Sequence, residues 1–188
     1  SRSSAASDVY KRQSPTSTVS DSTFSTAALT VLATTDIHGH VFDWDYFADA
    51  AFPPSDKGRS SAPLGVSRVA TIAKQVRAEQ GADSVVMLDN GDTIQGTPLT
   101  YLSAKQPEKL GHDEVMARAF NLVGYDAANI GNHEFNYGVA ELFRYHNDLK
   151  APLLCANVID VKTGKPLTQG SLMPVSYTHL TLPTIYSV

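Results

Sequence analysis

The stretch YDAANIGNHEFNYG, residues 125–138, joins a short apolar run to a polar turn. Its run DAANI (126–130) predicts a buried β-strand by length and composition. Asn132 and His133 stand side by side directly after this run, with a glycine on either side of the motif. Glycine permits the tight turn that would present both side chains at the end of the strand. The stretch therefore predicts a strand that ends at a functional site.

Strands and helices alternate on both sides of this stretch. Short apolar runs predict further strands at residues 29–36, 84–92 and 151–160. Apolar residues near helical spacing, with glycine and acidic end signals, predict helices at residues 64–81, 113–123 and 139–149. The pattern carries no hairpin signal and no internal repeat, and it is typical of an α/β layered domain.

Each of the first three predicted strands is followed by side chains that can bind a metal ion. These side chains are Asp36 and His38, then Asp92, then Asn132 and His133. Ligands of open α/β sheets collect outside the carboxyl ends of the strands, so we expect these groups to converge. An aspartate at a strand end is by itself more often a turn former or a helix cap. The joint pattern D-x-H, G-D and G-N-H-E, in this order, favours one shared site.

The donor types in this pattern restrict the chemistry of the site. Carboxylate, imidazole and amide oxygen suit divalent ions such as Zn, Mn, Fe, Co or Mg. The single cysteine, Cys155, excludes a thiolate cage and an intrachain disulfide, and we expect it to be a buried apolar thiol. Two neighbouring ions can clamp a phosphoryl group and activate water. His133 could then protonate the leaving oxygen or stabilise charge on the phosphoryl group.

The composition excludes two classes of partner. The chain has 188 residues, 42% of them hydrophobic and 18% charged, which is ordinary for a globular domain. Its formal net charge is −4 and it contains no block of lysine or arginine, so the electrostatic signature of a duplex-binding protein is missing. No apolar run approaches the roughly 20 residues that a membrane helix needs. We therefore expect neither binding to nucleic-acid duplexes nor a membrane span.

The same motifs carry a resemblance to a known family. TTDIHGH (34–40), DNGDTIQGTPL (89–99) and GNHEFNYG together resemble the calcineurin-like metallophosphoesterases. Within that family, FDWDYF (42–47) and ANVIDVKTGKPL (156–167) are similar to the branch of secreted nucleotidases and cyclic phosphodiesterases. The likeness covers residues 29–167, which correspond to the first half of the family's catalytic domain. It implies an α/β fold built as a two-sheet β-sandwich flanked by helices.

The resemblance also implies roles for individual residues. Asp36 and His38 would bind the first of two divalent metal ions. Asp92 would bridge the ions, and Asn132 would bind the second. His133 would be the catalytic histidine. The family's remaining histidine ligands, and the C-terminal domain that holds the nucleoside, have no counterpart in the motifs of this chain. We therefore expect a C-terminal half of the same protein to complete the site, and the 188 residues alone to be inactive.

The activity that the resemblance implies is two-metal hydrolysis of nucleotide phosphoesters. A 2′,3′-cyclic nucleotide would be opened to the 3′-nucleotide, which would then lose its phosphate to give the nucleoside. The expected location is the periplasm, the cell wall or the medium. Three alternatives remain open. One is a 5′-nucleotidase or sugar-nucleotide hydrolase, another is a DNA-processing phosphoesterase, which would need a basic groove, and the third is an inactive binding protein.

Three neighbours of these residues have expected roles of their own. Glu134 is expected to be a structural acid where the strand meets the next helix. Asn136 is expected to cap that helix, to accompany His133, or both. The 5′-nucleotidase branch usually has aspartate at this position, and an asparagine cannot stabilise an imidazolium by charge. His40 is expected to be an ordinary loop residue near the site.

The two ends of the chain differ in character from the middle. SSAASDVYKRQ (3–13) resembles the translation of an adapter used in DNA sequencing libraries, and VSYTHLTLPT (175–184) resembles the translation of the same adapter read from the opposite strand. We therefore interpret residues 1–13 and 175–188 as adapter-derived. Residues 14–28 are rich in serine and threonine and are expected to be a flexible lead-in. The N-terminal part of the metallophosphoesterase domain would then occupy residues 29–174.

Overall fold

A four-stranded parallel β-sheet forms the centre of the protein. The computed structural model describes residues 28–51, 64–172 and 185–186. The sheet has the order β1-β2-β3-β4, with β1 at Thr30–Thr34, β2 at Val85–Asp89, β3 at Ala127–Asn129 and β4 at Leu153–Leu154. All three neighbouring pairs are parallel. The four predicted strands are therefore present, and their carboxyl ends share one edge of the sheet.

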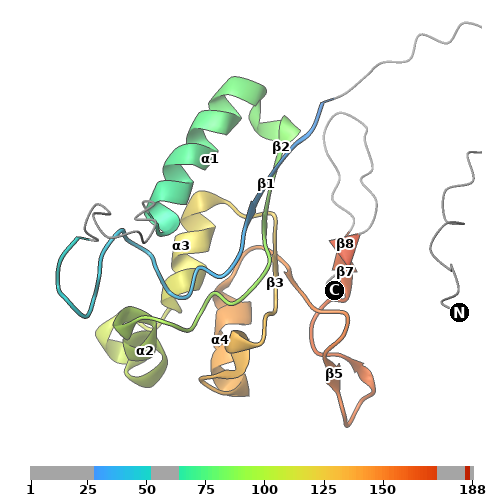
Figure 1. Ribbon diagram of the computed structural model, residues 1–188. Coiled ribbons are helices and arrows are strands. Elements are labelled where there is room, and N and C mark those ends of the chain that lie inside the picture. The colour runs from blue at the N-terminus through green and yellow to red at the C-terminus, as the bar shows by residue number, and fades with distance from the viewer. Residues whose placement is uncertain (1–27, 52–63, 173–184, 187–188) are drawn as a thin grey trace, which may run out of the picture.

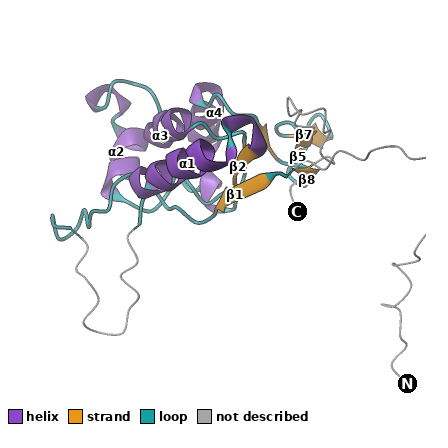
Figure 2. Cartoon of the chain, turned by 90° about the horizontal axis from the view of Figure 1, so that it is seen from above, coloured by secondary structure: helices purple, strands orange, loops and turns teal. Residues whose placement is uncertain are grey.

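Four α-helices pack on one side of this sheet, as Figures 1 and 2 show from two directions. They are α1 at Val66–Gln80, α2 at Pro98–Lys105, α3 at Val115–Val123 and α4 at Val139–Asp148. Helices α1, α3 and α4 confirm the predicted helices within two residues, and Gly81 is the C-cap of α1. None of the described helices has the length and apolar composition of a membrane-spanning segment.

Helix α2 is absent from the prediction. It has only eight residues, so it offers little periodicity to read. The sequence nevertheless contains a helix start signal. Thr97 is the N-cap and accepts a hydrogen bond from the backbone nitrogen of Thr100, and Pro98 occupies the first helical position. Short 3₁₀ turns complete the helical structure at η1 Ala82–Ser84, η2 Pro107–Lys109 and η3 His133–Phe135.

The predicted strand at 151–160 is two separate strands. Only Leu153 and Leu154 join the sheet as β4, and the chain leaves the sheet where the backbone nitrogen of Cys155 bonds to the carbonyl of Gln169. β5 at Ile159–Asp160 then pairs antiparallel with β6 at Lys165–Pro166, which is a hairpin that the sequence pattern did not reveal. β7 at Ser171–Leu172 pairs with β8 at Ile185–Tyr186.

The hydrophobic core lies between the sheet and the helices. Phe120 of α3 and Tyr145 of α4 are almost fully buried, and Phe120 stacks on Tyr125 with ring centroids 4.0 Å apart. Met87 and Leu153 of the sheet belong to the same apolar cluster. Cys155 is buried and free, as predicted. This core fixes the helices to one face of the sheet and thereby fixes the loops at its edge.

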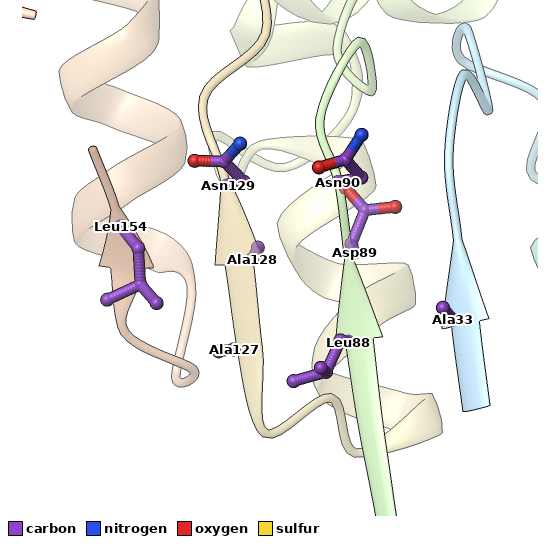
Figure 3. A pocket seen from close by; sticks show the side chains of 8 residues that line it. All are labelled: Ala33, Leu88, Asp89, Asn90, Ala127, Ala128, Asn129 and Leu154. Atoms are coloured by element: carbon purple, nitrogen blue, oxygen red, sulfur yellow. The ribbon is translucent and has the colours of Figure 1, made fainter. Parts of the chain in front are cut away.

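The opposite face of the sheet has a mainly apolar hollow within the described part of the chain. A cavity of about 270 Å³ lies there, lined by Ala33, Leu88, Ala127 and Leu154 together with Asn90 and Asn129. Figure 3 shows these side chains on the four strands, with the two asparagines at the carboxyl ends of β2 and β3. The predicted adapter-derived and lead-in segments fall almost wholly outside the described residues.

Candidate metal centre

Three loops at the carboxyl edge of the sheet bring all five predicted site residues together. Asp36 and His38 follow β1, Asp92 follows β2, and Asn132 and His133 follow β3. A cleft of about 530 Å³ opens at this edge, and Asp36, Asp92 and Asn132 all line it. The convergence expected from the parallel strand order is therefore present in the fold.

The distances at this edge suit a cation site. One ligand atom each from His38, Asp92 and His133 lies within 4.8 Å of the others. The Nε2 atom of His38 is also 3.9 Å from Oδ1 of Asp36. The rings of His38 and His133 meet edge to face, with centroids 5.1 Å apart. Carboxylate and imidazole donors at this spacing fit a divalent ion such as Zn, Mn, Fe or Co.

The orientation of His38 is set by a backbone carbonyl. Its Nδ1 lies 3.0 Å from the carbonyl oxygen of Gln95. When Nδ1 carries the proton and donates to this carbonyl, Nε2 presents its lone pair on the side of Asp36. A backbone acceptor behind a ligating histidine is the usual arrangement in metal sites. Among the described residues, the Nδ1 atom of His133 is buried and has no hydrogen-bond partner.

The backbone of the site is held in an unusual conformation. Asp36, His38 and Asp92 have positive φ angles of 54°, 48° and 57°. Residues other than glycine rarely occupy this region, and such positions cluster at functional sites. Backbone bonds tie the first two loops together: the nitrogens of Asp36, His38 and Gly39 donate to the carbonyls of Gly91, Asp92 and Thr93. The β1 and β2 loops therefore form one continuous support.

Two glycines let the second and third loops approach each other. A Cβ atom on Gly91 would collide with the backbone nitrogen of Gly131, and one on Gly131 would collide with the side chain of Asp92. The close approach allows the backbone nitrogen of His133 to donate to Oδ1 of Asp92 at 2.8 Å. Gly131 is thus needed for contact between loops, while Gly138 has the positive φ that begins α4.

Glu134 lies beneath these loops and has no exposed surface. It accepts hydrogen bonds from four backbone nitrogens, those of Asp92, Thr93, Ile94 and Gly131. Its expected structural role is confirmed. The predicted cap role of Asn136 is wrong, because Gly138 is the N-cap of α4 and no side chain bonds to that helix end. Asn136 instead ends the η3 turn in helical conformation.

A second buried carboxylate, Asp89, was missed by the sequence analysis. It ends β2 and accepts hydrogen bonds from the hydroxyls of Thr34 and Thr93 and from the backbone nitrogen of Gly91. Burial raises the pKa of Asp89 to about 6, and the nearby charge of Glu134 adds to the rise. An aspartate that closes a buried apolar strand was the only available signal.

His40 lies on a neighbouring cleft together with Asp36 and His38. Burial, and then the proximity of His38, hold the pKa of His40 below its ordinary value.

Comparison with known proteins finds relatives that are named as phosphodiesterases and nucleotidases. No family model matches the chain. The 2′,3′-cyclic-nucleotide 2′-phosphodiesterase/3′-nucleotidase of Yersinia enterocolitica is 42% identical over 156 residues, which are 83% of this chain and 22% of the relative. The 5′-nucleotidase of Vibrio parahaemolyticus is 32% identical over 148 residues, which are 79% of this chain and 23% of that protein. The chain thus spans less than a quarter of these relatives.

A solved structure of another protein has a similar fold. The crystal structure of the calcineurin-like phosphoesterase YfkN from Bacillus subtilis matches with a TM-score of 0.66 and 30% identity, over 82% of this chain and 45% of that one. The chain therefore belongs to the calcineurin-like metallophosphoesterases and spans part of their domain. Three relatives named as 2′,3′-cyclic-nucleotide 2′-phosphodiesterase/3′-nucleotidase are 37–42% identical to it over the aligned residues. The α/β fold expected from the resemblance is confirmed.

Proposed function

We propose that the protein hydrolyses nucleotide phosphoesters with two divalent metal ions. It would convert 2′,3′-cyclic nucleotides to 3′-nucleotides and then release phosphate and the nucleoside. The observation that carries this proposal is the convergence of His38, Asp92 and His133 within 4.8 Å at the carboxyl edge of the sheet. The names of the relatives supply the class of substrate.

The residues of the site would share the work as follows. Asp36 and His38 would hold one ion, Asp92 would be common to both, and Asn132 would hold the other. Bound divalent ions would supply Lewis acidity toward the phosphoryl group and make water more acidic. His133 would bind the phosphoryl group or donate a proton to the leaving oxygen. The hydrogen bond from its backbone nitrogen to Asp92 keeps this imidazole beside the metal ligands.

A 5′-nucleotidase activity is the second candidate, because relatives with that name also match. Asn136 favours the cyclic phosphodiesterase. It stands three residues after His133, where the 5′-nucleotidase branch usually has aspartate, and it offers no charge to raise the basicity of an imidazole. We place the activity in the periplasm, the cell wall or the medium, where nucleotides from RNA breakdown are available. A further part of the same protein would supply the remaining ligands and the nucleoside pocket.

The test uses the full reading frame that contains this sequence, expressed as one protein. Phosphate release and product formation would be measured with 2′,3′-cyclic AMP, 3′-AMP and 5′-AMP, in Mn²⁺ and after chelation. We expect the first two substrates to be turned over at least tenfold faster than 5′-AMP, and chelation to abolish turnover. Preference for 5′-AMP would support the second candidate, while hydrolysis of none of the three would reject both. The 188-residue chain alone is expected to be inactive.

A further inference from the structure

Glu134 links two loops that carry predicted metal ligands. Its Oε2 atom accepts from the backbone nitrogen of Asp92 at 2.9 Å and from that of Gly131 at 2.6 Å. Asp92 is the predicted bridging ligand of the β2 loop, and Gly131 directly precedes Asn132 of the β3 loop. One carboxylate oxygen is therefore shared between the two loops.

The other oxygen completes the hold on the β2 loop. Oε1 accepts from the nitrogens of Thr93 and Ile94. All four donors are backbone N–H groups, so they can move away from Glu134 only if the loops themselves move. No lysine or arginine forms an ion pair with Glu134 among the described residues. Both oxygens of this buried side chain are thus satisfied by backbone donors of the two loops, and this arrangement requires both loops to stay in place.

We infer that Glu134 is a positioning residue that sets the separation between Asp92 and Asn132. This separation would determine how well these two ligands fit the second ion. This inference rests on the metal-binding part of the proposed function. The role is distinct from general support of the fold. It predicts that loss of the carboxylate changes metal affinity and ligand geometry even in a protein that remains folded.

The substitution Glu134→Gln tests this role with little change in volume. Glutamine offers one acceptor oxygen and one NH₂ donor in place of two acceptor oxygens. Whichever way the amide is turned, its NH₂ group faces two backbone N–H donors. One pair of loop contacts is therefore lost. Outer contacts of metal ligands typically change metal affinity about 10- to 100-fold, and we expect a loss in this range.

Glu114→Gln is the matched control. Glu114 is about as deeply buried as Glu134, but it caps α3, and its carboxylate accepts from the backbone nitrogen of Ala117 in that helix. Both variants would be made in the full reading frame. Mn²⁺ binding would be measured by titration calorimetry, and the Co²⁺ absorption spectrum would report ligand geometry. We expect Glu114→Gln to keep the wild-type Mn²⁺ affinity and Co²⁺ spectrum, and Glu134→Gln to change both while its circular dichroism stays native.

A shorter carboxylate gives a second measurement if Glu134→Gln does not fold. Glu134→Asp keeps both oxygens but loses one methylene, so it cannot reach both loops, and we again expect weaker Mn²⁺ binding. Wild-type affinity and spectrum in either folded variant would overturn the inference alone. Failure of both variants to fold would also overturn it, since Glu134 would then be required for the fold as a whole. A wild-type protein that binds no Mn²⁺ would overturn the proposed function as well.

Discussion

The closeness of the β2 and β3 loops can be tested by adding a single methyl group. Gly91→Ala places a Cβ where the backbone nitrogen of Gly131 already lies. This neighbour is backbone, so it cannot move aside by side-chain rotation. Gly91 also has a φ of 95°, which alanine adopts only with strain. The substitution therefore combines backbone strain with a collision between loops.

The two contributions can be separated with a control glycine. Gly81, at the end of α1, has a similar φ of 86°, and a Cβ there would meet no atom within 4 Å. Strain of this kind costs roughly 1–3 kcal/mol at either position. Overpacking adds about 1–3 kcal/mol, and only at Gly91. The lower entropy of alanine in the unfolded chain favours both variants equally and cancels in the comparison.

The assay measures the melting temperature of each variant by scanning calorimetry, with both variants made in the full reading frame. For a domain of 150–250 residues, 1 kcal/mol corresponds to roughly 2–4 °C, and the shift is smaller for a larger domain. Gly91→Ala should therefore melt below Gly81→Ala, by up to about 12 °C. It should also bind Mn²⁺ more weakly, whereas Gly81→Ala should bind as the wild type does. Equal melting temperatures for the two variants would refute the collision, and with it the contact between the loops.

Two further predictions concern buried and ligating carboxylates. Asp92→Ala should abolish metal binding and turnover in the full reading frame, and activity retained in Mn²⁺ would exclude Asp92 as the bridging ligand. Burial raises the pKa of Glu114 from 4.5 to about 7, with Glu141 adding to the rise and Arg144 opposing it. Because the folded state holds this proton more tightly than the unfolded state, stability should fall by on the order of 3 kcal/mol as pH rises from about 4.5 to 7. Glu114→Gln should lack this part of the fall in melting experiments at pH 5 and pH 8, and an unchanged pH profile would contradict the shift.

The sequence predicted the parts of the fold that local pattern encodes. The apolar runs before Asp36, Asp92 and Asn132 are strands, and their parallel order brings the three residues to one edge. Period and length were sufficient because β2, β3 and β4 are largely buried and each crossover contains a helix. The site could be located before its geometry was known, since parallel strands leave few places for polar groups to meet.

The remaining features depend on contacts that are distant in sequence. Asp89 at the end of β2 accepts a hydrogen bond from the hydroxyl of Thr34, which is 55 residues away. Glu134 accepts hydrogen bonds from backbone nitrogens about 40 residues upstream. Nearly every residue type has a backbone N–H group, so the sequence does not reveal which residues donate. Beside β4, the carbonyl of Gln169 accepts a hydrogen bond from the backbone nitrogen of Cys155. Pattern analysis of a single sequence has no access to such pairs.

The left-handed backbone at Asp36, His38 and Asp92 also limits how this site can evolve. Asparagine, aspartate, histidine and glycine tolerate positive φ, whereas β-branched residues do not. Replacement of Asp92 by valine would therefore be eliminated through misfolding, before any question of activity arises. Replacement by asparagine would keep the backbone geometry and remove the charge, whereas glycine would also remove the acceptor of the His133 backbone nitrogen. Relatives that have lost catalysis should therefore still have asparagine, aspartate, histidine or glycine at these three positions. The residue types at these positions are thus restricted by backbone geometry as well as by metal binding.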